Sequence, residues 1–339
     1  MTVIEVAVVL GVLLLAVFIL LPLMAGIRTG HHGGRQLKDS TQLRGVTQAC
    51  AIWAQNNNGF YPIPSEIDQE GATLPRAAGL VGPDRTLDTT GNTLSLLIWN
   101  GFIPVELAVN PAEPGNVEVY DDYETAVPTA AVNPYKAYWD PAFRGTPLDE
   151  PGGKVPGKVG DPSHNSYAQM AWFGERASLW SNTFASTQAC WGNRGPVYEL
   201  HNAQWRPVKG NQFGDRSITM LAHGSRKSWS GNIAFNDQHT EFVTSPDPQQ
   251  LVWTFPGLGG NPTSMTMPDN LFHAEHDHNR APISEHATPV SGTDGRGVIY
   301  RTTGAGGTGA LDQKNNYLRP IARVLPGENG KIEAQIWID

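Results

Sequence analysis

Charged side chains and cysteines are scarce in this sequence. Only 17% of its 339 residues are charged, and Asp and Glu outnumber Lys and Arg by 32 to 24, which gives a formal net charge of -8. A nucleic-acid-binding surface needs clustered cations, so this balance argues against nucleic acid as a partner. Cys50 and Cys190 allow one disulfide in an extracytoplasmic compartment, and the alternative is that Cys50 is a core residue on an apolar helical face.

The sequence motifs of common enzyme classes are also missing. The chain contains no G-x-S-x-G elbow, no P-loop and no dinucleotide-binding fingerprint. We therefore expect no enzymatic activity and no required cofactor.

Two segments are rich in metal-competent side chains. In LFHAEHDHNRAP, a divalent ion such as zinc has four candidate ligands, namely His273, His276, Asp277 and His278. The spacing matches neither H-x-H-x-D-H nor HExxH, so a polar surface loop is the alternative. The acidic run VYDDYET, with Asp121, Asp122 and Glu124, is a candidate for Ca²⁺, although it lacks EF-hand spacing and a solvated loop is again the alternative.

The longest apolar run stands at the start of the chain. No charged side chain occurs from Val6 to Ile27, and a helix of these 22 residues is roughly 33 Å long, about one bilayer core. The sequence therefore predicts a membrane helix over residues 1–27. Glu5 precedes this run, and burying it costs on the order of 2.5 kcal/mol or more unless it is paired, whereas solvation at the membrane interface is the alternative.

This N-terminal pattern resembles the mature N-terminus of type IV pilins and of the pseudopilins of type II secretion. In that family a prepilin peptidase removes a short basic leader, the new first residue is N-methylated, a glutamate follows at the fifth position, and a proline interrupts the helix. Met1, Glu5 and Pro22 match these positions. The resemblance implies that Met1 is a processed and methylated terminus.

The same resemblance implies how the protein works. Its N-terminal helices would bundle at the centre of a filament made of many copies of this chain, with the globular parts outside. Glu5 would pair with the α-amino group of Met1, its own or a neighbour's, and set the register of assembly. The implied partners are the inner membrane before assembly, the prepilin peptidase and the pilus assembly machinery, and the implied location is then the cell surface.

The next segment predicts a break and a second helix. Three glycines in RTGHHGGR, residues 28–35, favour a flexible break. Over residues 36–58, apolar side chains recur at helical spacing and predict a half-helix that packs on the globular part. The apolar stripe comprises Leu43, Val46, Cys50 and Trp53, and the side chains expected in water are Lys38, Asp39, Arg44, Gln48 and Gln55.

Residues 59–339 predict a large, loop-rich globular domain of the α+β class with antiparallel strands, because 37 Gly and 26 Pro interrupt the chain. Leu94, Leu97 and Ile98 favour a short buried helix, and residues 127–160 a surface insertion. Residues 233–242 predict a hairpin with its turn at 236–238. Three tryptophans with polar neighbours are candidates for ligand contact or for the core, namely Trp191, Trp205 and Trp229.

Two of these segments extend the resemblance. QLRGVTQACAIWAQNNNGFYP and HGSRKSWSGNIAFNDQHTEFV resemble the corresponding parts of large pilin-like proteins of planctomycetes. That resemblance implies that His223 and Asp237 are hairpin residues that stabilise the fold. Two other functions stay open: a minor pseudopilin of a type II secretion system, and a membrane-anchored ectodomain enzyme that uses the cluster from His273 to His278.

Overall fold

The computed structural model describes residues 33–149, 162–202, 204–255, 265–274, 288–289, 297–301, 311, 314–326 and 332–338. Residues 33–55 are helical and are called the N-terminal helix below. The other helices are α2 (Pro64–Ile67), η1 (Arg85–Leu87), α3 (Thr90–Trp99), η2 (Val105–Ala108), η3 (Pro134–Lys136), η5 (Gly174–Leu179) and η6 (Ile218–Leu221). The strands are β1 (Tyr167–Met170), β2 (Ala189–Asn193), β3 (Tyr198–His201), β4 (Gln204–Pro207), β5 (Gly231–Phe235), β6 (Thr240–Val243), β7 (Val252–Phe255), β8 (Met265–Pro268), β9 (Thr288–Pro289), β10 (Gly297–Arg301), β11 (Leu318–Arg319), β12 (Ile321–Pro326) and β13 (Ile332–Trp337).

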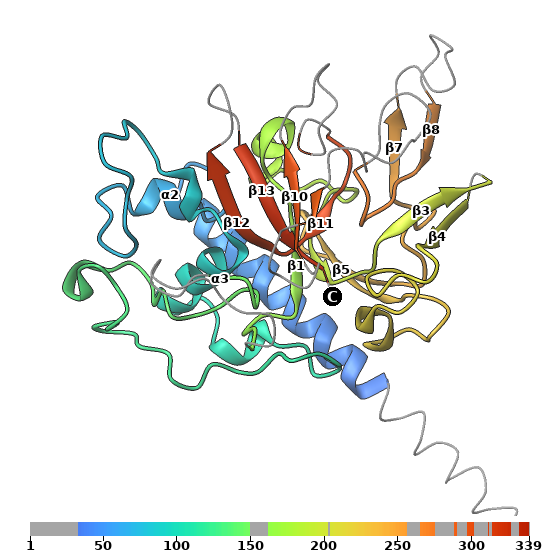
Figure 1. The fold of residues 1–339 in the computed structure, drawn as a ribbon, viewed down its shortest axis with the longest axis horizontal. Coiled ribbons are helices and arrows are strands. Elements are labelled where there is room, and N and C mark those ends of the chain that lie inside the picture. The colour runs from blue at the N-terminus through green and yellow to red at the C-terminus, as the bar shows by residue number, and fades with distance from the viewer. Residues whose placement is uncertain are drawn as a thin grey trace, which may run out of the picture.

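The described strands form two main sheets. The first has the order β11-β1-β2-β5-β6 and the second the order β12-β13-β10-β9, while β3-β4 and β7-β8 are separate two-stranded ribbons (Figure 1). Every pairing between these strands is antiparallel. The predicted class, α+β with antiparallel sheet and a helix toward the N-terminus, is confirmed. The predicted segment 1–27 lies outside the described residues.

The N-terminal helix buries the predicted apolar stripe. Leu43, Val46 and Cys50 are 0% exposed and Trp53 is 8% exposed. The predicted flexible break is wrong for its last three residues, because residues 33–35 are already helical. A helix tolerates single glycines at a cost of about 1 kcal/mol each relative to alanine, and docking of the following turns outweighs that cost.

The N-terminal helix ends before residue 58, where the sequence predicted its end, and a turn that contains glycine caps it. Asn58 and Gly59 have φ of 53° and 83°, in the left-handed region, and the N–H of Gly59 donates to the carbonyl oxygen of Ala54 at 2.9 Å. Such a turn satisfies a carbonyl that the helix leaves without a partner. The chain then reverses and pairs Phe60 with Ser181 in an isolated bridge.

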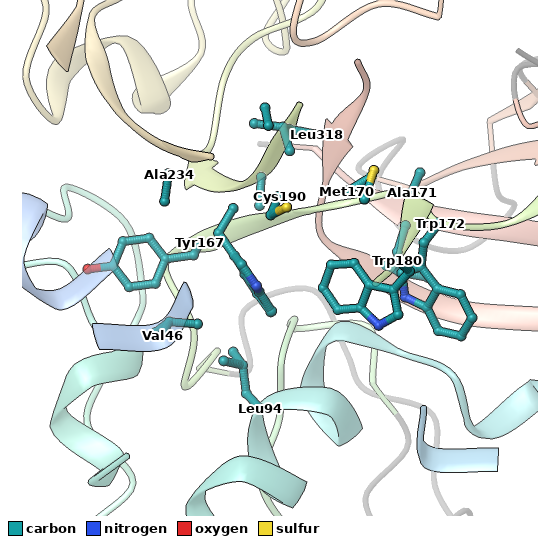
Figure 2. Packing of buried hydrophobic residues seen from close by; sticks show 14 of the residues in the cluster. Val46, Leu94, Tyr167, Met170, Ala171, Trp172, Trp180, Cys190, Ala234 and Leu318 are labelled. Carbon is teal, nitrogen blue, oxygen red and sulfur yellow. The ribbon is translucent and has the colours of Figure 1, made fainter. Parts of the chain in front are cut away.

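The core lies between the helices and the first sheet. Val46 of the N-terminal helix, Leu94 of α3 and Cys190 of β2 are all 0% exposed, and Figure 2 shows them around the strands of this sheet. Trp172 and Trp180 stack with ring centroids 5.9 Å apart. The core interpretation of Cys50, Trp191 and Trp229 is confirmed by their burial, and both cysteines are free thiols rather than a disulfide.

The predicted surface insertion is partly wrong. Trp139, Phe143 and Leu148 are at most 2% exposed, so residues 139–149 belong to the core. Glycines make this packing possible, because a Cβ on Gly145 would lie 2.3 Å from the backbone nitrogen of Gly91 in α3. Proline and glycine in this segment therefore mark a close approach of two backbones and not an exposed loop.

A histidine is enclosed by aromatic rings beside this segment. His164 is 5% exposed, stacks on Tyr120 at 4.4 Å between ring centroids, and accepts a hydrogen bond at Nδ1 from the backbone N–H of Arg144 at 2.9 Å. Burial, with a smaller effect of the Arg144 charge, lowers the pKa of His164 from 6.5 to about 4. The folded protein therefore holds this imidazole neutral at neutral pH.

Truncation of the apolar stripe should destabilise the fold. We predict that Leu43→Ala lowers the free energy of unfolding by about 2–5 kcal/mol, because it leaves a cavity under a fully buried side chain. Leu37, on the same helix, is 67% exposed, so Leu37→Ala should change it by less than about 0.5 kcal/mol. Denaturant unfolding in detergent, followed by tryptophan fluorescence, measures both. Equal effects of the two variants would contradict the burial of this stripe.

The buried imidazole predicts a loss of stability in acid. Between pH 6.5 and about 4 the unfolded chain protonates His164 but the folded chain does not, so the free energy of unfolding falls as the pH falls through this range. The expected loss is on the order of 3 kcal/mol. His164→Gln removes this titration, so the difference in stability between wild type and variant should shrink toward pH 4. A difference that is constant with pH would be inconsistent with a neutral buried imidazole.

Candidate functional site

Asp39 in the N-terminal helix is a buried carboxyl group on the surface by which this helix contacts the first sheet. It was expected to face water, and this prediction is wrong, because its side chain is 0% exposed. A carboxylate in a protein interior costs several kcal/mol unless charges or hydrogen bonds compensate it. The site around Asp39 supplies that compensation.

Four donors converge on the carboxyl group of Asp39. Oδ1 accepts from the Tyr167 hydroxyl at 2.9 Å and from Asn193 Nδ2 at 3.3 Å. Oδ2 accepts from Asn232 Nδ2 at 2.6 Å and from His223 Nε2 at 2.8 Å. A carboxylate has only acceptor positions, and this arrangement fills both oxygens twice. We call Asp39 and its four donors the Asp39 cluster.

Three adjacent strands provide three of these donors. Tyr167 in β1 and Asn193 in β2 are directly paired across the sheet. Asn193 Oδ1 in turn accepts the backbone N–H of Asn232 in β5 at 2.6 Å. Because β1, β2 and β5 are consecutive in the sheet, the three polar side chains form a row across it. This row faces the N-terminal helix and fixes where the helix crosses the sheet.

The hydroxyl of Tyr167 is kept as a donor by its surroundings. Burial, followed by the nearby charge of Asp39, raises the pKa of Tyr167 well above its usual value of 10. At neutral pH the tyrosine therefore stays protonated. Its hydroxyl also lies 3.4 Å from Gln42 Oε1, one turn further along the helix.

His223 has a different place from the one predicted. It follows η6 and contacts the N-terminal helix, so it is not a hairpin residue, whereas Asp237 does lie in the turn between β5 and β6. The His223 side chain donates from Nε2 to Asp39, and the same nitrogen lies 3.4 Å from Asn110 Nδ2. An acid and a histidine alone do not make a catalytic triad, which also needs a hydroxyl or thiol nucleophile on the imidazole. The geometry of His223 supports a structural role, which is to attach the N-terminal helix to the rest of the protein.

Neighbouring polar contacts extend this attachment along the helix. The backbone oxygen of Gln36 accepts from Asn232 Nδ2 at 3.1 Å, and Gln42 Nε2 donates to the backbone oxygen of Glu106 at 2.9 Å. Gln36, Asp39 and Gln42 are spaced by three residues, so they occupy one side of the helix. The helix is thus held by polar contacts from Gln36 to Gln42 and by apolar contacts from Leu43 onward.

The residues predicted for assembly lie outside the described residues. This holds for Met1, Glu5 and Pro22, and equally for three of the four predicted metal ligands, His276, Asp277 and His278. Their proposed roles therefore remain predictions from the sequence. Within the described part of the chain, no helix combines the length and the apolar character needed to cross a bilayer.

The fourth predicted ligand, His273, is described. Its ring packs against Trp205, with centroids 4.9 Å apart, and burial, with a smaller effect of the Arg319 charge, lowers its pKa from 6.5 to about 3. A neutral imidazole is the form that binds metal. Among the described residues, however, no group of three His, Cys, Asp or Glu side chains surrounds a common point. Because the other three predicted ligands lie outside the described residues, the zinc site stays a prediction from the sequence.

The acidic run also lacks a described ion site. Glu124 Oε2 accepts from the backbone N–H of Thr129 at 2.5 Å and from its hydroxyl at 2.9 Å, while Asp121 and Asp122 are exposed. The carboxylate of Glu124 thus closes a local turn. The alternative of a solvated acidic loop agrees with this geometry.

Comparisons with known proteins give no relative for this chain. It matches no protein-family model, no curated protein and no solved structure.

Replacement of the Asp39 carboxylate should lower the stability of the fold far more than the same substitution at an exposed position. We predict that Asp39→Asn lowers the free energy of unfolding by about 3–5 kcal/mol, because the amide replaces an acceptor oxygen by an NH2 donor that faces the existing donors. Asp121→Asn makes the same chemical change at an exposed position and should alter it by less than about 0.5 kcal/mol. Denaturant unfolding of both variants tests this. An Asp39→Asn protein as stable as wild type would show that the cluster does not hold the helix.

Proposed function

We propose that this chain is a structural subunit of a type IV pilus-like filament, assembled through its N-terminal segment. The observation that carries the proposal is the sequence MTVIEV followed by a charge-free run from Val6 to Ile27. In this proposal residues 1–27 form the N-terminal part of one long helix. They first lie in the inner membrane and then bundle with the same residues of other copies at the centre of the filament. The globular residues from 59 onward form the outer layer of the filament.

The Asp39 cluster supports this proposal. A subunit that assembles through a projecting helix needs this helix to be rigidly attached to the globular part. The packing of the helices in the filament then determines where each globular part lies. The described helix leads directly back toward the apolar segment, and its first described turns are held by hydrogen bonds from three strands. Directional hydrogen bonds fix an orientation more narrowly than apolar contacts do.

In the proposed filament Glu5 has one function, which is to pair with the α-amino group of Met1. The pair offsets the cost of placing a carboxylate among apolar side chains and sets the axial register between copies. Prepilin peptidase, which would produce this amino group, and the pilus assembly machinery are the proposed partners. Location at the cell surface follows from assembly.

A minor pseudopilin is the second candidate, because the same N-terminal residues support it. The two differ in abundance. A main pilin is the dominant protein of fibres sheared from the source cells, whereas a minor pseudopilin is a rare component of a short periplasmic structure. Electron microscopy of sheared fibres, with mass spectrometry of the N-terminus, separates the two: this chain as the main fibre protein, beginning with N-methylated Met1, would support the first.

Glu5 provides the mutational test. We predict that Glu5→Ala leaves a folded, membrane-inserted monomer but reduces the yield of filaments by about tenfold or more, because the unpaired amino group of Met1 is then costly to bury. The matched control is Glu70→Ala, which removes an exposed carboxylate from a loop of the globular part and should leave the yield unchanged. A normal filament yield from Glu5→Ala would contradict the proposed pairing.

A further inference from the structure

A groove of about 730 Å³ opens beside the end of the N-terminal helix. Its walls come from the turn after that helix, from α2, from the segment 172–178 that leads into η5, and from Ile332 at the start of β13. Pockets that bind small molecules measure about 300–1,000 Å³, so this groove has the size of a ligand site. It lies apart from the Asp39 cluster and shares no lining residue with it.

Aromatic rings make up much of the wall. The five aromatic residues that line the groove are Trp53, Phe60, Tyr61, Trp172 and Phe173. Four of them are at most 8% exposed and form the floor, while Phe60 is 45% exposed and stands at the rim. An aromatic ring offers a flat apolar face, and a ligand can stack on it only where part of that face is accessible to solvent.

The backbone around Phe60 is fixed, so the exposure of its ring is built into the fold. The N–H of Phe60 donates to the Asn57 carbonyl oxygen at 3.0 Å, and the N–H of Tyr61 donates to the Trp180 carbonyl oxygen at 3.2 Å. Phe60 also forms the isolated bridge with Ser181. What distinguishes Phe60 from other exposed apolar side chains is its position among the aromatic residues that line the groove.

The charges that line the groove cancel. Among the described residues that line it, the charged ones are Glu66 and Arg85, which form an ion pair at 3.2 Å. Arg85 also contacts the buried carboxylate of Asp88 at 3.3 Å. A charged ligand would therefore meet no unpaired opposite charge here, and an uncharged ligand fits better.

The rim carries planar polar groups next to these rings. Asn57, Asn58 and Ser178 line the groove together with the ion pair, and all are at least partly exposed. Amide, carboxylate and guanidinium groups each present neighbouring donor or acceptor atoms, which match pairs of adjacent hydroxyl groups. A purely aliphatic ligand would take these polar groups out of water without offering them hydrogen bonds, whereas a sugar ring has an apolar C–H face and a polar edge.

We infer that this groove binds a neutral carbohydrate chain of hexopyranose units, with one sugar ring stacked on Phe60 and its hydroxyl groups bonded to the polar rim. The inference is independent of filament assembly, because no residue that lines the groove belongs to the segment 1–27 through which the proposed filament assembles. The carbohydrate site and the filament function can therefore each be disproved without affecting the other. On a filament subunit, such a groove would give the outer layer a contact with polysaccharide.

The test uses the full chain in a detergent without a sugar headgroup, with cellohexaose and maltohexaose as probes. Because Trp53 and Trp172 line the groove, we expect binding of at least one probe to change tryptophan fluorescence with a Kd of about 1 mM or tighter. Phe60→Ala should weaken this binding about tenfold or more. Phe184→Ala removes another exposed ring, 65% exposed and outside the groove, and should leave the Kd unchanged.

Three outcomes would overturn the inference. The first is no saturable change with either sugar. The second is an equal loss of binding in Phe60→Ala and Phe184→Ala, which would place the contact elsewhere. The third is displacement of the sugar by dodecanol, or tighter binding of that alcohol alone, which would make the groove an acyl-chain site. Because the ligand is neutral, raising the salt concentration should leave the Kd unchanged, and a strong salt dependence would also contradict it.

Discussion

The burial of one carboxyl group constrains the arrangement of the first sheet and of the helix on it. Asp39 has no access to water, so its oxygens depend on donors that the protein supplies, and each donor must stand within hydrogen-bond distance. Tyr167, Asn193 and Asn232 satisfy this requirement only if β1, β2 and β5 keep their register, because a slip of one residue would turn the side chains to the other face. The helix position, the strand register and the segment that carries His223 are therefore coupled through a single residue.

Much of the fold could be predicted from the sequence, because periodicity and glycine placement act locally. The stripe from Leu43 to Trp53, the buried helix α3 and the β5–β6 hairpin all follow from spacing and turn residues. The burial of residues 139–149 could not be predicted in this way. Its cause is the contact between Gly91 and Gly145, which joins two segments far apart in the sequence.

The Asp39 cluster was missed although a signal was present. Counting back from Leu43 by four residues gives Asp39, and by three more gives Gln36, so the spacing of the apolar stripe already places both on the buried face. The assumption that an aspartate faces water outweighed this pattern. The donors themselves could not be found from spacing, because Tyr167, His223 and Asn232 are 128, 184 and 193 positions away from Asp39. The groove at Phe60 is likewise formed by distant segments, from residue 53 to residue 332.

The order of contacts along the N-terminal helix also has a mechanical consequence. Force applied to the helix from its N-terminal end reaches the hydrogen bonds at Gln36 and Asp39 before it reaches the apolar stripe. Those bonds join the helix to three neighbouring strands, so tension is shared by the sheet instead of acting on one loop. Resistance to pulling depends on the rate of unfolding rather than on equilibrium stability. The Asp39 cluster therefore acts as a tether, and its rupture is the first step when the helix is pulled away from the sheet.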